Sequence, residues 1–145
     1  MERDTLAAVN ASRLVPVAVA VVCAVLGVYL AMSSRGEARL HRADAHVLAG
    51  RNTAALAKLK GLDGEYERRA WVLRGYAYFG TGRLERARVE LQKAVRRDPN
   101  NWVLQRDYAI VLLRLGERPK ARARMRRAVA LNPRMLLPPG FVLSK

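Results

Sequence analysis

The sequence predicts an all-α protein: one N-terminal single transmembrane helix followed by a short solenoid of about three helix pairs. Three observations predict this. Residues 14–32 carry no charge, Ala, Leu and Arg dominate the composition and favour helix, and two 34-residue segments align without a gap. The predicted parts are an N-terminal tail (1–13), an anchor (14–32), a degenerate first repeat (33–67), two full repeats (68–101 and 102–135) and an apolar C-terminal tail (136–145).

The predicted anchor is the uncharged run Leu14–Met32, which lies between Arg13 and Arg35. A helix of this length reaches ~28 Å, close to the thickness of the hydrocarbon core of a bilayer. A cleaved signal peptide is the alternative, because Ala31 and Ser33 resemble a small-residue cleavage site. The run is longer than the usual apolar region of a signal peptide, so we expect an uncleaved, single-pass membrane segment.

The orientation of this anchor stays open. Arg35, Arg39 and Arg42 follow it closely, whereas the two arginines before it are partly offset by acids. The positive-inside tendency therefore favours a cytoplasmic C-terminal domain, but only weakly, because long domains translocate regardless of charge.

Small residues line one side of the predicted anchor. Ala20, Ala24, Gly27 and Ala31 follow one another at spacings of four, three and four residues. Such a stripe lets membrane helices approach closely and would allow a homo-oligomer, although Ala and Gly are common in any membrane helix.

The net charge is +15, and the whole excess lies after the anchor. A surplus of this size favours acidic partners or anionic lipid, although an Arg-rich coding bias would give the same composition. Its densest part, residues 120–127, is expected to be a solvated helix face. Nucleic acid is not an expected partner, because no aromatic residues interleave the basic ones.

The internal repeat is the strongest pattern in the chain. Residues 68–101 align with residues 102–135 at an offset of 34 throughout. Small residues and prolines recur in phase: Gly82 with Gly116, Ala87 with Ala121, Ala94 with Ala128, and Pro99 with Pro133. A period of this length is typical of stacked helical hairpins.

These residues resemble the tetratricopeptide repeat (TPR) family, here of a membrane-anchored, bacterial type. The first full repeat supplies Trp71, Gly75, Tyr78, Ala87, Ala94 and Pro99, and the second supplies Tyr108, Ala109, Leu112, Ala121, Met125, Ala128 and Pro133. The sequence departs from the family pattern at Arg74, Leu91, Gln105 and Pro119. A degenerate third copy lies upstream, with Gly50 at the turn and Ala43 and Ala55 at small-residue positions.

The resemblance implies a groove lined by the first helix of each repeat, where a peptide or protein binds. The corresponding positions of the full repeats are Arg69, Val72, Tyr76, Phe79, Gly80, Val103, Arg106, Ile110, Leu113 and Arg114. Those of the degenerate repeat are Glu37, Leu40, Asp44, Val47 and Leu48. Leu40 and Asp44 replace the Lys and Asn that grip a terminal carboxylate in some family members, so that mode of binding is not expected.

The C-terminal tail offers an alternative occupant for this groove. Phe141, Val142 and Leu143 are apolar, so the tail either covers the groove, caps the last repeat or leaves the surface to an external partner.

No catalytic, metal-binding or cofactor-binding motif occurs in the sequence, and neither an enzyme nor a cofactor is expected. Two functions remain. One is a membrane-tethered adaptor that binds a protein or peptide, and the other is a structural subunit of a membrane assembly that oligomerises through its anchor and repeats.

Overall fold

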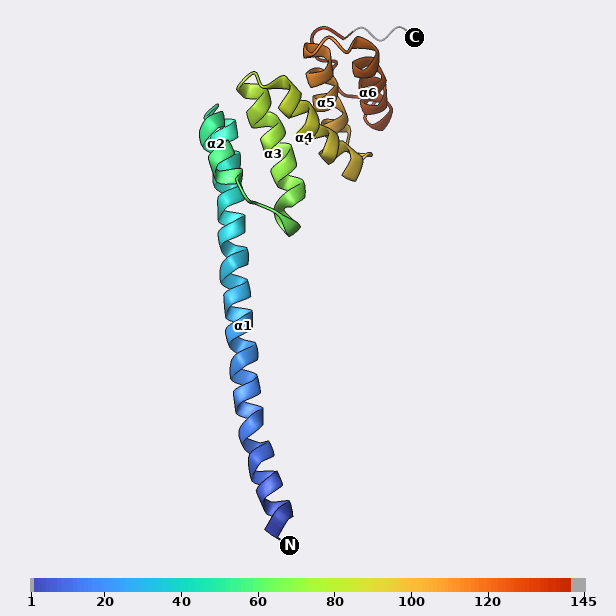
Figure 1. Ribbon diagram of the computed structural model, residues 1–145. Coiled ribbons are helices and arrows are strands. Elements are labelled where there is room, and N and C mark those ends of the chain that lie inside the picture. Colours follow the sequence, from blue (N-terminus) through green and yellow to red (C-terminus); the bar gives the residue numbers. More distant parts are fainter. Residues whose placement is uncertain (1, 142–145) are drawn as a thin grey trace. The chain divides into compact units, whose positions relative to one another are not determined.

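The computed structural model describes residues 2–141, and for residues 2–15, 17 and 18 it describes the backbone alone. Within that part of the chain every regular element is helical, which confirms the all-α prediction (Figure 1). The elements are α1 (Glu2–Leu48), α2 (Asn52–Leu59), the short 3-10 helix η1 (Gly64–Tyr66), α3 (Glu67–Gly80), α4 (Leu84–Arg97), α5 (Trp102–Arg114) and α6 (Arg118–Leu131).

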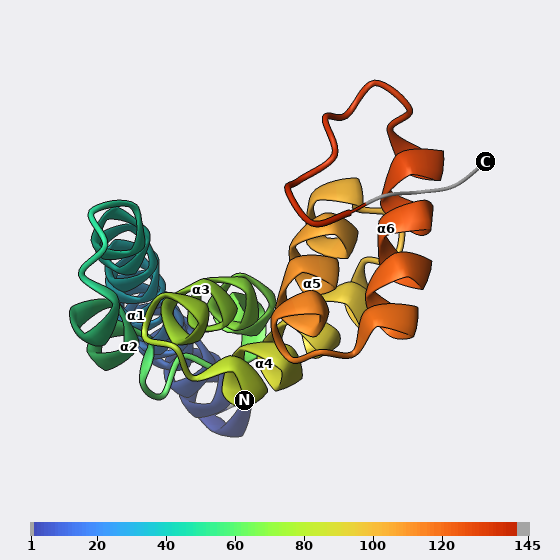
Figure 2. The ribbon, with the colours of Figure 1, turned by 90° about the horizontal axis from the view of Figure 1, so that it is seen from above.

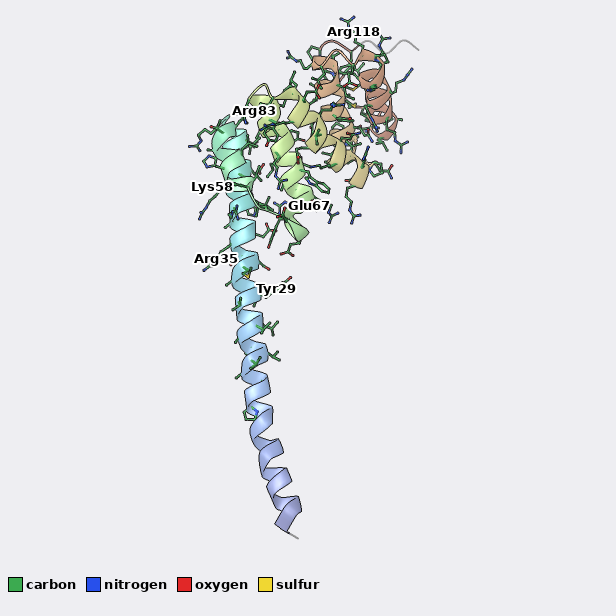
Figure 3. All side chains as sticks on the ribbon, viewed as in Figure 1. Tyr29, Arg35, Lys58, Glu67, Arg83 and Arg118 are labelled. Carbon is green, nitrogen blue, oxygen red and sulfur yellow. The ribbon has the colours of Figure 1, made fainter. Side chains whose placement is uncertain are left out.

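Two compact units divide the chain, Met1–Ala38 and Arg39–Lys145. The first is the N-terminal part of α1, and its apolar side chains from Val19 to Met32 are exposed (Figure 3). From Val19 onward the helix is long and apolar enough to cross a membrane by length and composition, with a mean hydropathy of 1.7 over an 18-residue window. An N-terminal signal sequence passes the same test. Leu14 and Val15, where the predicted anchor starts, lie outside the residues whose side chains are described.

The second unit contains three helical hairpins that are closed by the same turn. At Gly82 the backbone has φ +72°, and the N–H of Arg83 donates to the Tyr78 carbonyl at 2.9 Å. This is a Schellman turn, in which glycine takes the left-handed conformation that other residues avoid. Gly116 and Gly50 have φ +80° and +69° and close their turns with the equivalent bonds.

Small residues let the helices of each full hairpin touch. Gly75 in α3 faces Leu91 in α4 so closely that a Cβ at position 75 would lie 2.6 Å from the leucine Cγ. Ala109 in α5 is fully buried at the equivalent position of the next hairpin. The core that results also buries Ala87, Ala94, Val95, Leu104, Tyr108, Val111, Leu112, Ala121, Met125 and Ala128.

A second, smaller core joins the first hairpin to α3. Leu40 and Ala43 of α1 pack there with Leu59 of α2 and with Ala70 and Leu73 of α3. The expectation that Leu40 lines a groove is therefore wrong, because its side chain has no exposed surface. In this short hairpin the neighbouring helix α3 contributes side chains to the cluster around Leu40.

Arg74 of α3 contacts the segment that follows the first hairpin's second helix. Its Nη2 donates to the carbonyl oxygens of Leu62 at 2.9 Å and Leu59 at 3.4 Å. Its Nη1 lies 3.6 Å from the Glu90 carboxylate of α4. Arg74 stands where the family has leucine. Its guanidinium group binds carbonyl oxygens at and just after the end of α2, where no further helical turn supplies N–H donors for them.

The C-terminal tail turns back from α6 toward α5 (Figure 2). Phe141 is 8% exposed and belongs to the main core, and Gly140 lies against Leu113 of α5. Leu136, by contrast, is 92% exposed. Val142 and Leu143 lie outside the described residues.

Candidate functional site

The helices α3 and α5 bring most of the predicted groove residues onto one surface, which we call the α3–α5 face. Its predicted members are Arg69, Val72, Tyr76, Phe79, Val103, Arg106, Ile110, Leu113 and Arg114. The surface follows from the repeat itself, because α3 and α5 are the first helices of successive hairpins and occupy equivalent positions in the stack.

The first hollow on this face has a volume of about 500 Å³ and lies beside the N-terminal halves of α3 and α5. Val72, Tyr76 and Val103 give it an apolar floor. Charged side chains surround that floor: Arg68, Arg69 and Arg97, with Glu65 and Asp98. The hollow thus combines apolar contact area with a rim that carries more positive than negative charge.

A second hollow of about 200 Å³ adjoins the first at Tyr76. Phe79 of α3 and Ile110 of α5 line it, together with Leu91 and Val111 of the core beneath. These side chains are mostly apolar, so this part of the face suits an apolar group of a ligand.

Tyr76 and Asp107 join the two helices across the face. The tyrosine hydroxyl donates a 2.7 Å hydrogen bond to Asp107 Oδ2. Arg106 Nε donates to Asp107 Oδ1 at 2.8 Å, and its guanidinium carbon lies 5.3 Å from the centre of the Trp102 ring. Burial, and then the nearby Asp107 carboxylate, raise the pKa of Tyr76 above its ordinary value. Tyr76 therefore stays protonated at neutral pH and acts as a hydrogen-bond donor.

Leu113 and Arg114 extend the face to the C-terminal end of α5. They line a third hollow, of about 720 Å³, with the tail residues Gly140 and Phe141 and with Arg118 and Arg122 of α6. The tail thus borders this end of the face. Neither tail residue lines the two hollows around Tyr76.

Gly80 does not join the α3–α5 face. A Cβ at that position would lie 2.2 Å from Asn52 Nδ2 of α2, so Gly80 borders a contact within the chain. The first turn of α2 occupies the space that a groove residue would need.

Several residues that line the first two hollows were not predicted from the sequence as groove residues, among them Arg68, Arg97 and Asp107. Asp107 carries no signal of its own, since an acid beside a basic residue on a helix is ordinary. Its partner Tyr76 is 31 positions away, three short of the repeat offset. A search for polar pairs at nearly one repeat length would have found this pair.

Comparison with known proteins supports the repeat assignment. Residues 78–134 match the family model described as tetratricopeptide repeat. The match covers less than half of the chain, from the end of α3 to just beyond α6. A comparison with curated proteins finds no match. The fold is thus an all-α array with TPR-type helical repeats, and such repeats suggest a role in protein–protein interaction.

Proposed function

We propose that the protein is a membrane-tethered interaction module that binds a peptide or protein segment on the α3–α5 face. One observation carries this proposal. Four of the predicted groove residues, Arg69, Val72, Tyr76 and Val103, line a single hollow of about 500 Å³ that adjoins the apolar hollow around Phe79. Apolar floors of this kind with charged rims are common in peptide-binding sites.

The tether is the apolar part of α1. Its exposed side chains between Val19 and Met32 are valine, leucine, alanine and similar residues, and burying them in lipid would remove a long apolar surface from water. Carbonate extraction combined with N-terminal sequencing tests this part of the proposal. A chain that stays in the membrane pellet and keeps its N-terminus supports the tether, whereas a new N-terminus near Ser34 contradicts it.

Site-specific photocrosslinking tests the binding face. A benzoylphenylalanine at position 72 lies in the first hollow, and the same residue at position 89 is the matched control. Val89 is 44% exposed on α4 and lines neither hollow. In the native membrane, position 72 should give a defined cross-linked product that position 89 does not give.

The identity of the protein cross-linked at position 72 also distinguishes an adaptor from a structural subunit. An adaptor gives a product with another protein, and adding Ile110→Glu should abolish it by placing a charge in the second hollow. Equal products from positions 72 and 89 would argue against the α3–α5 face. A product made only with other copies of this chain would favour a structural role.

A further inference from the structure

The third hollow, at the C-terminal end of α5, has an unusual charge distribution. Arg114, Arg118 and Arg122 line it, and none of the other residues around it is acidic. Their guanidinium groups form no ion pair or hydrogen bond within residues 2–141. Three like charges therefore surround one space of about 720 Å³, and no acidic residue of the described part of the chain lines it.

Other basic side chains nearby are engaged. Arg106 binds Asp107, Lys120 binds Glu117, and Arg127 donates to Asn100 at 2.8 Å. Glu117 is the acid closest in sequence to the hollow, but its two oxygens face Lys120 on one side and Arg88 on the other. The nearby carboxylates of Asp107 and Glu117 are thus paired with basic residues outside the third hollow, and the charged residues that line the hollow are all arginines.

The place of the hollow connects it to the α3–α5 face. Leu113 and Arg114 belong to that face, and Ile110 in the second hollow lies one helical turn before them. From Val103 to Arg114, α5 rises by about 16 Å. An extended peptide covers that distance with about five residues. One short segment can therefore reach from the first hollow to the third.

From these observations we propose that Arg114, Arg118 and Arg122 form a subsite for carboxylate side chains of an extended acidic peptide. The peptide places its apolar side chains between α3 and α5 and its acidic side chains in the third hollow, beside Leu113 and Phe141. This inference rests on the proposed function and adds the chemistry of the ligand. The proposed subsite differs from the terminal-carboxylate site of some family members. That site would lie at Leu40 and Asp44, which cannot bind a carboxylate, whereas the proposed subsite lies on α5 and α6.

A random decapeptide library displayed on phage tests the subsite, with the full chain held in nanodiscs of phosphatidylcholine. Peptides enriched on the protein should be rich in Asp and Glu. The variant Arg114→Gln/Arg118→Gln/Arg122→Gln should lose this preference and keep a preference for apolar residues. The matched control is Arg96→Gln/Arg126→Gln/Arg134→Gln, which removes three exposed arginines that line none of the three hollows.

Affinity gives a second measurement, and its comparison of peptides on the unaltered protein does not depend on the folding of a variant. The best enriched peptide, labelled with fluorescein, should bind the triple subsite variant about tenfold more weakly, as expected when a few partly exposed ion pairs are lost. Replacing the acids of the peptide by glutamine should cost about the same on the unaltered protein. The matched control should change the affinity less than about twofold.

The outcomes separate this inference from the proposed function. Enriched peptides without an acidic preference, or an acidic preference that survives the triple subsite variant, would overturn the subsite and leave the α3–α5 face as a binding surface. Peptides that bind equally well to a Val72→Glu/Ile110→Glu variant would contradict the proposed function, and the subsite would fall with it.

Discussion

The hydroxyl of Tyr76 donates a 2.7 Å hydrogen bond to the carboxylate of Asp107, and this bond joins α3 to α5 across the proposed binding face. The two helices are the first helices of successive hairpins, and Tyr76 lines both the first and the second hollow. Asp107 also accepts from Arg106, which keeps its second oxygen bonded.

Replacing Tyr76 by phenylalanine should lower the free energy of unfolding by about 1 kcal/mol, because one hydrogen bond to a partly buried carboxylate is lost. Urea denaturation of the full chain in detergent micelles measures this effect. A double-mutant cycle with Asp107→Ala, which removes the acceptor, should give a coupling energy of the same order. Independent, additive effects of the two substitutions would mean that the bond contributes nothing to stability.

The same tyrosine should make stability depend on pH in the alkaline range. The pKa of Tyr76 is raised by folding, first by burial and then by Asp107, so the folded state holds this proton more tightly than the unfolded state. The stabilisation is fully present below the unfolded pKa of about 10 and is lost as pH rises above it toward the folded pKa. Between pH 9 and 11, Tyr76→Phe should show a shallower loss of stability than the unaltered chain. Equal slopes would contradict the assignment.

Gly75→Val tests the close contact between α3 and α4. A Cβ at this position would already lie 2.6 Å from Leu91 Cγ and 2.8 Å from its Cδ2, so the larger side chain should destabilise the protein by about 1–3 kcal/mol through overpacking. The control is the same change in a Leu91→Ala background, where the space is free. There the loss should be much smaller, as measured by thermal unfolding.

Arg74→Leu, which restores the residue usual in the family, should weaken the first hairpin selectively. It removes the bonds to the carbonyls of Leu59 and Leu62 and leaves them without those partners, at a cost of about 1–2 kcal/mol. Hydrogen exchange should speed up in α2 and stay unchanged in α5 and α6. A uniform increase along the array would show that Arg74 acts on global stability instead.

Phe141→Ala measures what the tail contributes to the last repeat. Phe141 is 8% exposed within the main core, so its truncation should cost about 3 kcal/mol. Leu136→Ala is the matched control, because Leu136 is 92% exposed and should change stability by less than about 0.5 kcal/mol. Similar effects of the two substitutions would mean that the tail does not cap the array.

The paired hairpins were predictable because their determinants are local and periodic. Glycine at the turns and alanine at the helix contacts recur at an offset of 34, and α4 and α6 end just before Asp98-Pro99 and Asn132-Pro133. The resemblance to tetratricopeptide repeats, and not the period alone, implied the positions of Val72, Tyr76 and Ile110, and these residues line the first two hollows. Whether the residues before Glu67 form a true repeat, and whether this face binds a partner, stay predictions.

The features that escaped prediction depend on contacts between elements of different repeats. Arg74 read as a departure from the pattern, but its bonds reach backbone carbonyls whose position no sequence pattern specifies. Gln105 stands where the family has a large aromatic residue. It is buried, and its Nε2 donates to the Pro99 carbonyl at 2.8 Å. Leu40 was predicted to line a groove because the family's groove positions were transferred to this first hairpin, which is shorter than a full repeat.

Phe141 also bears on how an array of this kind grows. Solenoids lengthen when a duplicated unit stacks on the exposed end of the previous one. Here Phe141 of the C-terminal tail packs onto α5 and α6, where a hairpin inserted after Asn132 would have to displace it. An engineered array with a further hairpin inserted at this position would therefore have to replace the contacts that Phe141 makes with the core.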